Sequence, residues 1–196
     1  MPRIVNKDQR RKKEMEILEA VRLVFCRKGL SNVTMKDLID ATGMSRGGFY
    51  FYYQSVDEVF RAMAEHRAKS KFEEILHSIE DNPDFDELLD AYFSTQIQRL
   101  LHMDNSMIRA MYEYLFTHRG ENDHTFRDAQ VDKNLETVRV ILELGVRQGK
   151  VNPARLKDLT QHVMVCIEGL NALCMFGALS TQRLEAQFQL LKDIIV

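Results

Sequence analysis

The sequence has few of the residues that interrupt helices. Among its 196 residues there are three prolines, nine glycines and no tryptophan. Proline and glycine disfavour a helix interior, so their scarcity favours a mainly helical chain. No run of 18 apolar residues occurs, so we expect no membrane span. The N-terminal residues MPRIVNKDQRRKK lack the apolar core of a secretory signal, which favours a cytoplasmic protein.

Catalytic and metal-binding motifs are also missing. The six histidines fit no HExxH pattern, and there is no P-loop, GxSxG or glycine-rich dinucleotide turn. The cysteines Cys26, Cys166 and Cys174 form no CxxC pair and lie in apolar helical contexts, as small buried hydrophobes do. A redox-sensing role for one of them stays open. We expect no enzyme activity, no metal and no cofactor.

Positive charge is concentrated at the N-terminal end of the chain. Residues 1–48 hold eleven Lys or Arg and six Asp or Glu, whereas the whole chain has a net charge of −2. A basic end on an acidic body suits a protein that meets a polyanion with that end only. We expect residues 1–13 to form a flexible basic arm that contacts phosphate, although a solvated tail is the plainer interpretation.

The segment TMKDLIDATGMSRGGFYFYY, residues 34–53, predicts two short helices joined by a tight turn. Thr34 and Asp37 have capping-box spacing, Gly43 suits a left-handed helix end, and Ser45 is a second N-cap. Two helices joined in this way form either an ordinary helical hairpin or a helix-turn-helix, whose second helix enters the DNA major groove.

Residues 17–59, ILEAVRLVFCRKGLSNVTMKDLIDATGMSRGGFYFYYQSVDEV, resemble the N-terminal module of the TetR family (TetR/AcrR) of transcriptional regulators. The resemblance implies a DNA-binding site, and its expected residues are Thr34, Met35, Lys36, Ser45, Arg46, Gly47, Gly48, Tyr50, Phe51 and Tyr52. Two departures remove possible contacts: Val56 stands where the family often has lysine, and Gly48 where it often has threonine or serine.

The recognition helix can be divided into faces by its spacing. Phe49 and Tyr53 are one turn apart and should face the small core, whereas Arg46 and Tyr50 share another face. The resemblance implies that Tyr50 touches a phosphate. Arg46 could contact a guanine in the bidentate manner or bind a phosphate, and the sequence does not decide between them.

Helical periodicity and caps continue to the C-terminus. We expect an all-α fold of about nine helices, with a three-helix DNA-binding domain over residues 14–60 and a bundle over residues 61–196. The expected helices include 15–28, 55–80, 107–116, 124–148, 154–176 and 182–195, with a polar loop at 118–123 and Thr181 as the last N-cap. No flexible linker separates the two regions.

The resemblance implies that the last two helices, within residues 154–195, form a homodimer, and that the bundle binds a small-molecule effector. Methionines and aromatic side chains suit a pocket for varied apolar shapes, although each is more simply a core residue. A carboxylate in apolar surroundings requires a cation from the chain or from a ligand, and an internal salt bridge is the simpler case. The candidate ligand residues are Tyr92, Phe93, Met111, Tyr112, Glu113, Phe116, Glu168 and Asn171.

The function expected from the resemblance is that of a ligand-responsive transcriptional regulator. As a homodimer it would bind a palindromic double-stranded DNA operator, act as a repressor, and be released by a small, largely apolar molecule. The alternative is a helical ligand-binding or adaptor protein that has lost DNA binding; the basic N-terminal end and Tyr50 argue against it.

Overall fold

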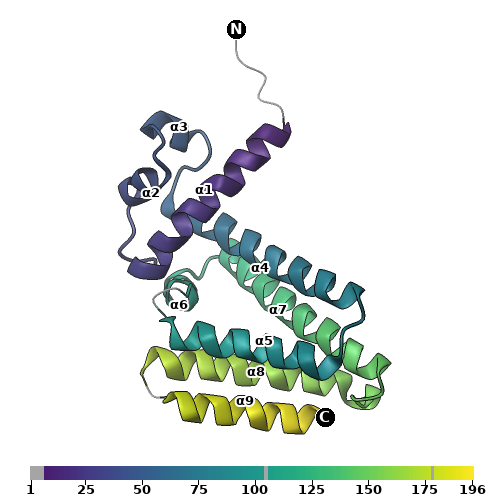
Figure 1. Ribbon diagram of the computed structural model, residues 1–196. Coiled ribbons are helices and arrows are strands. Elements are labelled where there is room, and N and C mark those ends of the chain that lie inside the picture. Colours follow the sequence, from purple (N-terminus) through teal and green to yellow (C-terminus); the bar gives the residue numbers. More distant parts are fainter. Residues whose placement is uncertain (1–6, 104–105, 178) are drawn as a thin grey trace. The chain divides into compact units, whose positions relative to one another are not determined.

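Helices form the regular structure of the described part of the chain (Figure 1). The computed structural model describes residues 7–103, 106–177 and 179–196. The helices are α1 (Lys7–Lys28), α2 (Met35–Thr42), α3 (Arg46–Tyr50), α4 (Val56–Glu80), α5 (Phe85–Leu101), α6 (Ile108–Thr117), α7 (Glu121–Arg147), the 3-10 turn η2 (Pro153–Arg155), α8 (Leu156–Met175) and α9 (Thr181–Ile195). The predicted all-α fold is confirmed over these ranges, and no helix among them is long and apolar enough to cross a membrane.

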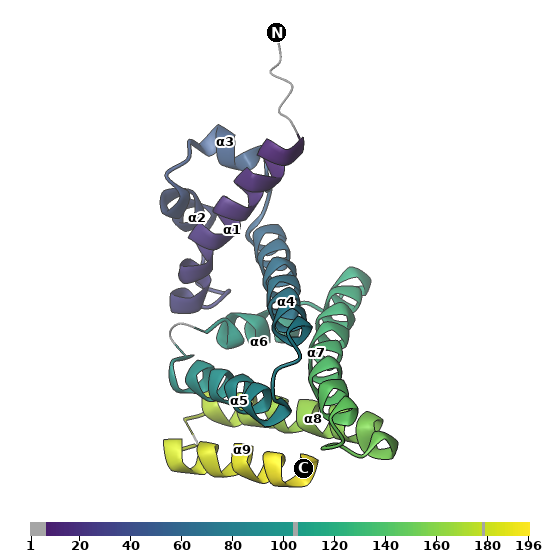
Figure 2. The same ribbon diagram turned by 45° about the vertical axis from the view of Figure 1, so that its right-hand side comes forward.

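The chain is organised as two units, and Figure 2 shows the helices of both in a second view. The first unit is Met1–Arg67 with Met107–Asp123, and the second is Ala68–Ser106 with His124–Val196. Helix α6 therefore belongs to the unit that holds the DNA-binding helices, although we predicted that everything after residue 60 forms one bundle. Helices α4 and α7 each run unbroken through a boundary between the units.

The core of the first unit is aromatic. Phe25 of α1 and Phe60 of α4 are fully buried, and their ring centroids lie 5.4 Å apart in an edge-on arrangement. Phe60 also stacks on Tyr114 of α6 at 5.2 Å, and Tyr114 is fully buried. Aromatic pairs of this geometry add stabilisation beyond the area that they bury, so α6 is an integral part of this core.

The second unit is built on contacts among α5, α7, α8 and α9. Phe93 of α5 packs against Phe188 of α9 with ring centroids 5.2 Å apart. The Gln148 amide fastens the α4–α5 turn, because it accepts from the Phe85 N–H at 3.0 Å and donates to the Pro83 carbonyl at 2.7 Å. Gly145 allows this close packing, since a Cβ there would lie 2.8 Å from the Phe85 ring.

Three predicted boundaries are wrong. Helix α1 begins at Lys7 rather than near residue 15, so residues 7–13 of the expected flexible arm are helical; residues 1–6 lie outside the described residues. Ion pairs one turn apart support this extension, including Arg10 with Glu14 at 3.0 Å. Helix α7 begins within the predicted 118–123 loop, and the N-cap of α9 is Ser180 rather than Thr181, because Ser180 accepts from the Arg183 N–H.

Candidate DNA-binding surface

The caps predicted for α2 are confirmed. The Thr34 hydroxyl accepts from the Asp37 N–H at 3.2 Å, and the Asp37 carboxylate accepts from the Thr34 N–H at 2.9 Å. Lys28 adds an ion pair to Asp37 at 2.6 Å, which joins the end of α1 to the start of α2. Gly43 ends α2 with φ +64°, a left-handed conformation that glycine adopts without strain.

These contacts should make the stability of the helix-turn-helix sensitive to acid. Hydrogen bonds from Lys28 and from the amide and hydroxyl of Thr34 lower the pKa of Asp37 to about 2. A carboxyl whose pKa is lowered on folding stabilises the fold above its ordinary pKa near 4, and this stabilisation is lost as pH falls toward 2. Asp37→Asn should therefore melt lower than wild type at pH 7, with the difference shrinking between pH 4 and pH 2. Thermal unfolding across this range checks it; a constant difference would contradict it.

Helix α3 is short and is held at both ends. The Ser45 side chain accepts from the Gly48 N–H at 3.2 Å, and the Phe51 N–H donates to the Gly47 carbonyl at 3.2 Å. Phe49 is fully buried and Tyr53 is 7% exposed, so the predicted core face of the recognition helix is confirmed. The opposite face of α3 is thereby turned outward.

Arg46 and Tyr50 do share a face, since the Arg46 guanidinium lies over the Tyr50 ring at 5.5 Å from its centroid. The two glycines differ in their surroundings. A Cβ on Gly47 would meet nothing within 4 Å, whereas one on Gly48 would lie 3.1 Å from the capping Ser45 Oγ. Gly48 therefore has a local reason to lack a side chain, and Gly47 leaves the backbone open to close approach.

The predicted DNA contacts fall on one segment of the first unit. Thr34, Lys36, Ser45, Arg46, Gly47 and Phe51 are exposed, and Met35, Gly48, Tyr50 and Tyr52 are half-buried. Phe51 is the outlier, because it is a phenylalanine with 61% of its surface exposed. The structure adds Arg10 of α1, whose guanidinium lies 5.5 Å from the Phe51 ring centroid. Sequence reasoning missed this pairing because it treated residues 1–13 as a flexible arm.

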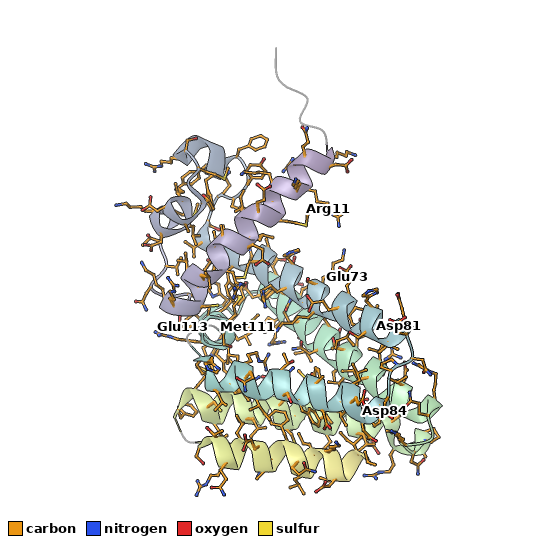
Figure 3. The ribbon with its side chains drawn as sticks, in the orientation of Figure 1. Arg11, Glu73, Asp81, Asp84, Met111 and Glu113 are labelled. Atoms are coloured by element: carbon orange, nitrogen blue, oxygen red, sulfur yellow. The ribbon has the colours of Figure 1, made fainter. Side chains whose placement is uncertain are left out.

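Glu113 of α6 is held by the protein itself (Figure 3). Its carboxylate accepts from the Leu30 N–H at 2.6 Å, from the Ser31 N–H at 2.8 Å, and from Arg109 Nε at 2.8 Å. Burial opposes ionisation, but these three donors outweigh it and lower the pKa of the Glu113 carboxyl. The internal ion pair, the simpler of the two interpretations, is the observed one, and Glu113 links α6 to the turn after α1.

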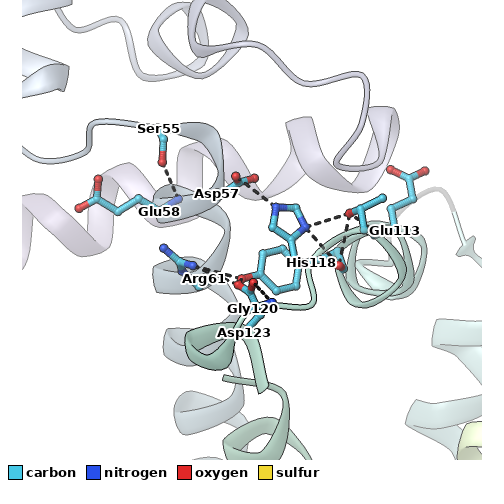
Figure 4. Close-up of polar contacts among 10 residues, drawn as sticks. Ser55, Asp57, Glu58, Arg61, Glu113, His118, Gly120 and Asp123 are labelled. Carbon is cyan, nitrogen blue, oxygen red and sulfur yellow. Dashed lines mark hydrogen bonds and ion pairs between the residues drawn. The ribbon is translucent and has the colours of Figure 1, made fainter. Parts of the chain in front are cut away.

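A second polar group joins α6 to α4 and α7 (Figure 4). The Tyr114 hydroxyl donates to the Asp123 carboxylate at 2.5 Å and accepts from Arg61 at 3.2 Å. His118 stacks on Tyr114 with ring centroids 4.2 Å apart, and its Nε2 lies 3.2 Å from an oxygen of Asp57 at the start of α4. Helix α6 is thus fixed along its length to the helices of the first unit.

The eight candidate ligand residues do not form a single group. Met111, Tyr112, Glu113 and Phe116 belong to the first unit, and Tyr92, Phe93, Glu168 and Asn171 to the second. Within the second unit, Arg99 of α5 donates to the side-chain Oδ1 of Asn171 in α8 at 3.1 Å. Burial raises the pKa of the Tyr92 phenol to about 12, with Arg99 and Glu168 acting on it in opposite directions.

An open groove of about 470 Å³ lies elsewhere in the second unit, between α7 and the start of α8. Its lining residues were not predicted as a site: Asp132, Leu135, Glu136, Arg139, Leu156, Lys157, Thr160 and Gln161. Helical spacing places four of them, Asp132, Leu135, Glu136 and Arg139, on one face of α7. No local pattern in the sequence indicates that α8 lies beside that face.

Comparison with known proteins decides the family. Residues 17–63 match the family model described as "Bacterial regulatory proteins, tetR family". The chain is 30% identical over 155 residues to YfiR of Bacillus subtilis (strain 168), an uncharacterized HTH-type transcriptional regulator, covering 77% of this chain and 74% of YfiR. The chain belongs to the TetR family. It is a DNA-binding transcriptional regulator and not an enzyme.

Solved structures of other proteins share the fold over nearly the whole chain. E. coli NemR in its reduced form superposes with a TM-score of 0.77 at 15% identity, covering 94% of this chain and 98% of NemR. The regulator FadR from Bacillus subtilis, in complex with stearoyl-CoA, superposes with a TM-score of 0.68 at 14% identity, covering 90% of this chain and 96% of FadR. At these identities the likeness concerns the fold alone.

Proposed function

We propose that this TetR-family protein is a cytoplasmic repressor that binds a palindromic operator as a homodimer and is released by a small effector. The observation that carries the proposal is the outer face of α3, where Arg46 and Tyr50 project together beside the side-chain-free Gly47. A short helix with a cationic, aromatic outer face and no bulk at its start suits insertion into the major groove. Two copies would occupy successive major grooves, about 34–36 Å apart.

The dimer is proposed to form through α8 and α9. His162, Cys166, Gly169, Leu173 and Phe176 follow one another at intervals of four and three along α8, and we name this row the α8 seam. Phe176 is 82% exposed, Val165 beside the seam is 69% exposed, and Leu190 of α9 is 52% exposed. Apolar side chains gathered on neighbouring helices mark a surface that another protein covers.

The effector site is proposed in the second unit, around Tyr92, Phe93, Glu168 and Asn171. There, polar side chains of α5 and α8 meet inside an otherwise apolar bundle, as the Arg99–Asn171 contact illustrates. A pocket with a few placed polar groups suits a largely apolar molecule that carries one polar end. The FadR complex with stearoyl-CoA supports an effector of that general kind. Glu113 is left out of this proposal because protein donors already occupy both of its oxygens.

Selection from random duplex DNA tests the proposal. The wild-type chain should enrich a near-palindrome, and a gel shift should report its affinity. Arg46→Ala should weaken the selected operator by about 1–3 kcal/mol and relax preference at one base position per half-site if Arg46 contacts a guanine. Tyr50→Phe should weaken binding to the operator and binding to unrelated duplex DNA by a similar factor, since phosphate contacts carry no sequence information.

Each outcome has a defined meaning. A selected site without dyad symmetry would contradict the palindromic dimer. Equal weakening of every duplex by Arg46→Ala would make Arg46 a phosphate contact. Failure of the wild-type chain to enrich any duplex would favour the alternative, a helical ligand-binding or adaptor protein that has lost DNA binding.

A further inference from the structure

Phe51 is an apolar side chain placed at the DNA-facing surface without a folding reason. It caps the C-terminal end of α3 and is 61% exposed, whereas the neighbouring Phe49 and Tyr53 fill the core of the unit. Keeping a large apolar side chain in water forgoes the free energy that burial would supply. In the major groove, the apolar group that a base presents is the C5-methyl group of thymine.

Arg10 of α1 contacts the Phe51 ring through its guanidinium. Its guanidinium lies 5.5 Å from the Phe51 ring centroid, while Tyr52 meets the same ring edge-on at 5.2 Å. Arg10 stands on a regular helix, because α1 begins at Lys7, and the Glu14 carboxylate accepts from Arg10 Nε at 3.0 Å. A guanidinium over an aromatic face is attracted by the ring, and the attraction grows when water is removed, as it is on binding DNA.

We infer that Arg10 is a positioning residue for sequence recognition: it orients the Phe51 ring against a thymine methyl group in each half-site. This inference rests on the proposed operator binding, and it names thymine as the base that Phe51 recognises. Fixing the ring before binding lowers the entropic cost of the contact, so Arg10 acts on specificity through another residue. Arg10 differs in this from the other basic residues of the N-terminal end, which are expected to contact phosphate.

The experiment replaces each thymine of the selected operator by uracil, which removes only the methyl group. The wild-type chain should bind the operator about fourfold more weakly when the thymine that contacts Phe51 is replaced by uracil. This factor corresponds to the burial of one methyl group. Phe51→Ala should abolish that difference and so identify the thymine. Arg10→Gln should reduce the thymine-to-uracil ratio to below about twofold, and Arg10→Lys, which keeps a cation near the ring, should restore part of it.

Arg11→Gln is the matched control, since it removes the same charge one residue further along α1 (Figure 3). Arg11→Gln should keep the wild-type ratio of affinities for the thymine and uracil operators. If Arg11 contacts a phosphate, the slope of log K against log salt should become shallower by about 0.9. The inference is overturned if Arg10→Gln keeps the wild-type ratio of thymine to uracil affinity. It is also overturned if Phe51→Ala loses as much affinity as the wild-type chain when that thymine is replaced by uracil. A wild-type chain that enriches no duplex overturns the proposed function and this inference with it.

Discussion

Gly169→Leu should convert the regulator from a dimer to a monomer and weaken operator binding by about 10²–10⁴-fold. Gly169 lies in the middle of the α8 seam, and a Cβ built there meets nothing within 4 Å. Gly169 is also exposed in the single chain, so the fold of one chain tolerates leucine, which favours a helix by roughly 1 kcal/mol over glycine. If the seam packs closely against a second copy, the added side chain holds the two copies apart.

The loss of affinity follows from the loss of bivalency. A dimer engages its second half-site intramolecularly, whereas two monomers must bind independently. Light scattering gives the mass in solution, and a gel shift gives the operator affinity. Gly169→Ala serves as the control, because it brings a similar gain in helix propensity with one methyl group and should remain dimeric. A Gly169→Leu protein that stays dimeric with full operator affinity would show that the interface lies elsewhere.

The helix-turn-helix could be predicted from the sequence because its determinants are local. The Thr34–Asp37 capping box, the left-handed Gly43 and the Ser45 cap each depend on residues within three or four positions. The burial of Phe49 and Tyr53 follows from helical spacing alone. The same local logic could have shown that α1 begins at Lys7, had the Arg10–Glu14 spacing been given more weight than the overall charge of residues 1–13.

The place of α6 could not be predicted, because it depends on partners far apart in the sequence. Glu113 attracted attention as a carboxylate in apolar surroundings, and its pairing with Arg109 is a local helical contact. Its other two donors are backbone amides 82 and 83 residues away. Every residue other than proline has a backbone N–H, so the sequence does not show which amides will bind a carboxylate. The sequence therefore could not place α6 in the first unit.

Gly29→Ala should lower the stability of the protein more than alanine at any of the other left-handed glycines, Gly43, Gly149 and Gly177. Gly29 follows α1 with φ +73°, where a side chain costs about 1–2 kcal/mol. Its new Cβ would also lie 2.6 Å from both oxygens of Glu113. The carboxylate would have to leave the Leu30 and Ser31 amides, and each hydrogen bond to a charged group contributes about 1.5–3 kcal/mol. We expect a total loss of about 3 kcal/mol or more.

Gly149→Ala is the matched control, since Gly149 also has φ +73° and a Cβ there meets nothing within 4 Å. It incurs the backbone strain alone, so the difference between the two variants measures the Glu113 contact. For a chain of this length about 1 kcal/mol lowers the melting temperature by about 2–4 °C, so the two should be separable by thermal unfolding. Hydrogen exchange at Leu30 and Ser31 should rise in Gly29→Ala only.

The Glu113→Gln background separates the two causes within the first unit. There the charged contact is already weakened, so adding Gly29→Ala should cost little beyond the backbone strain, and the two substitutions should not be additive. Additive losses, or a Gly29→Ala protein as stable as Gly149→Ala, would show that the Glu113 carboxylate moves aside without loss. In that case α6 would be held in the first unit by the Phe60–Tyr114–His118 stack and by the hydrogen bonds of the Tyr114 hydroxyl to Arg61 and Asp123, rather than by its link to the turn after α1.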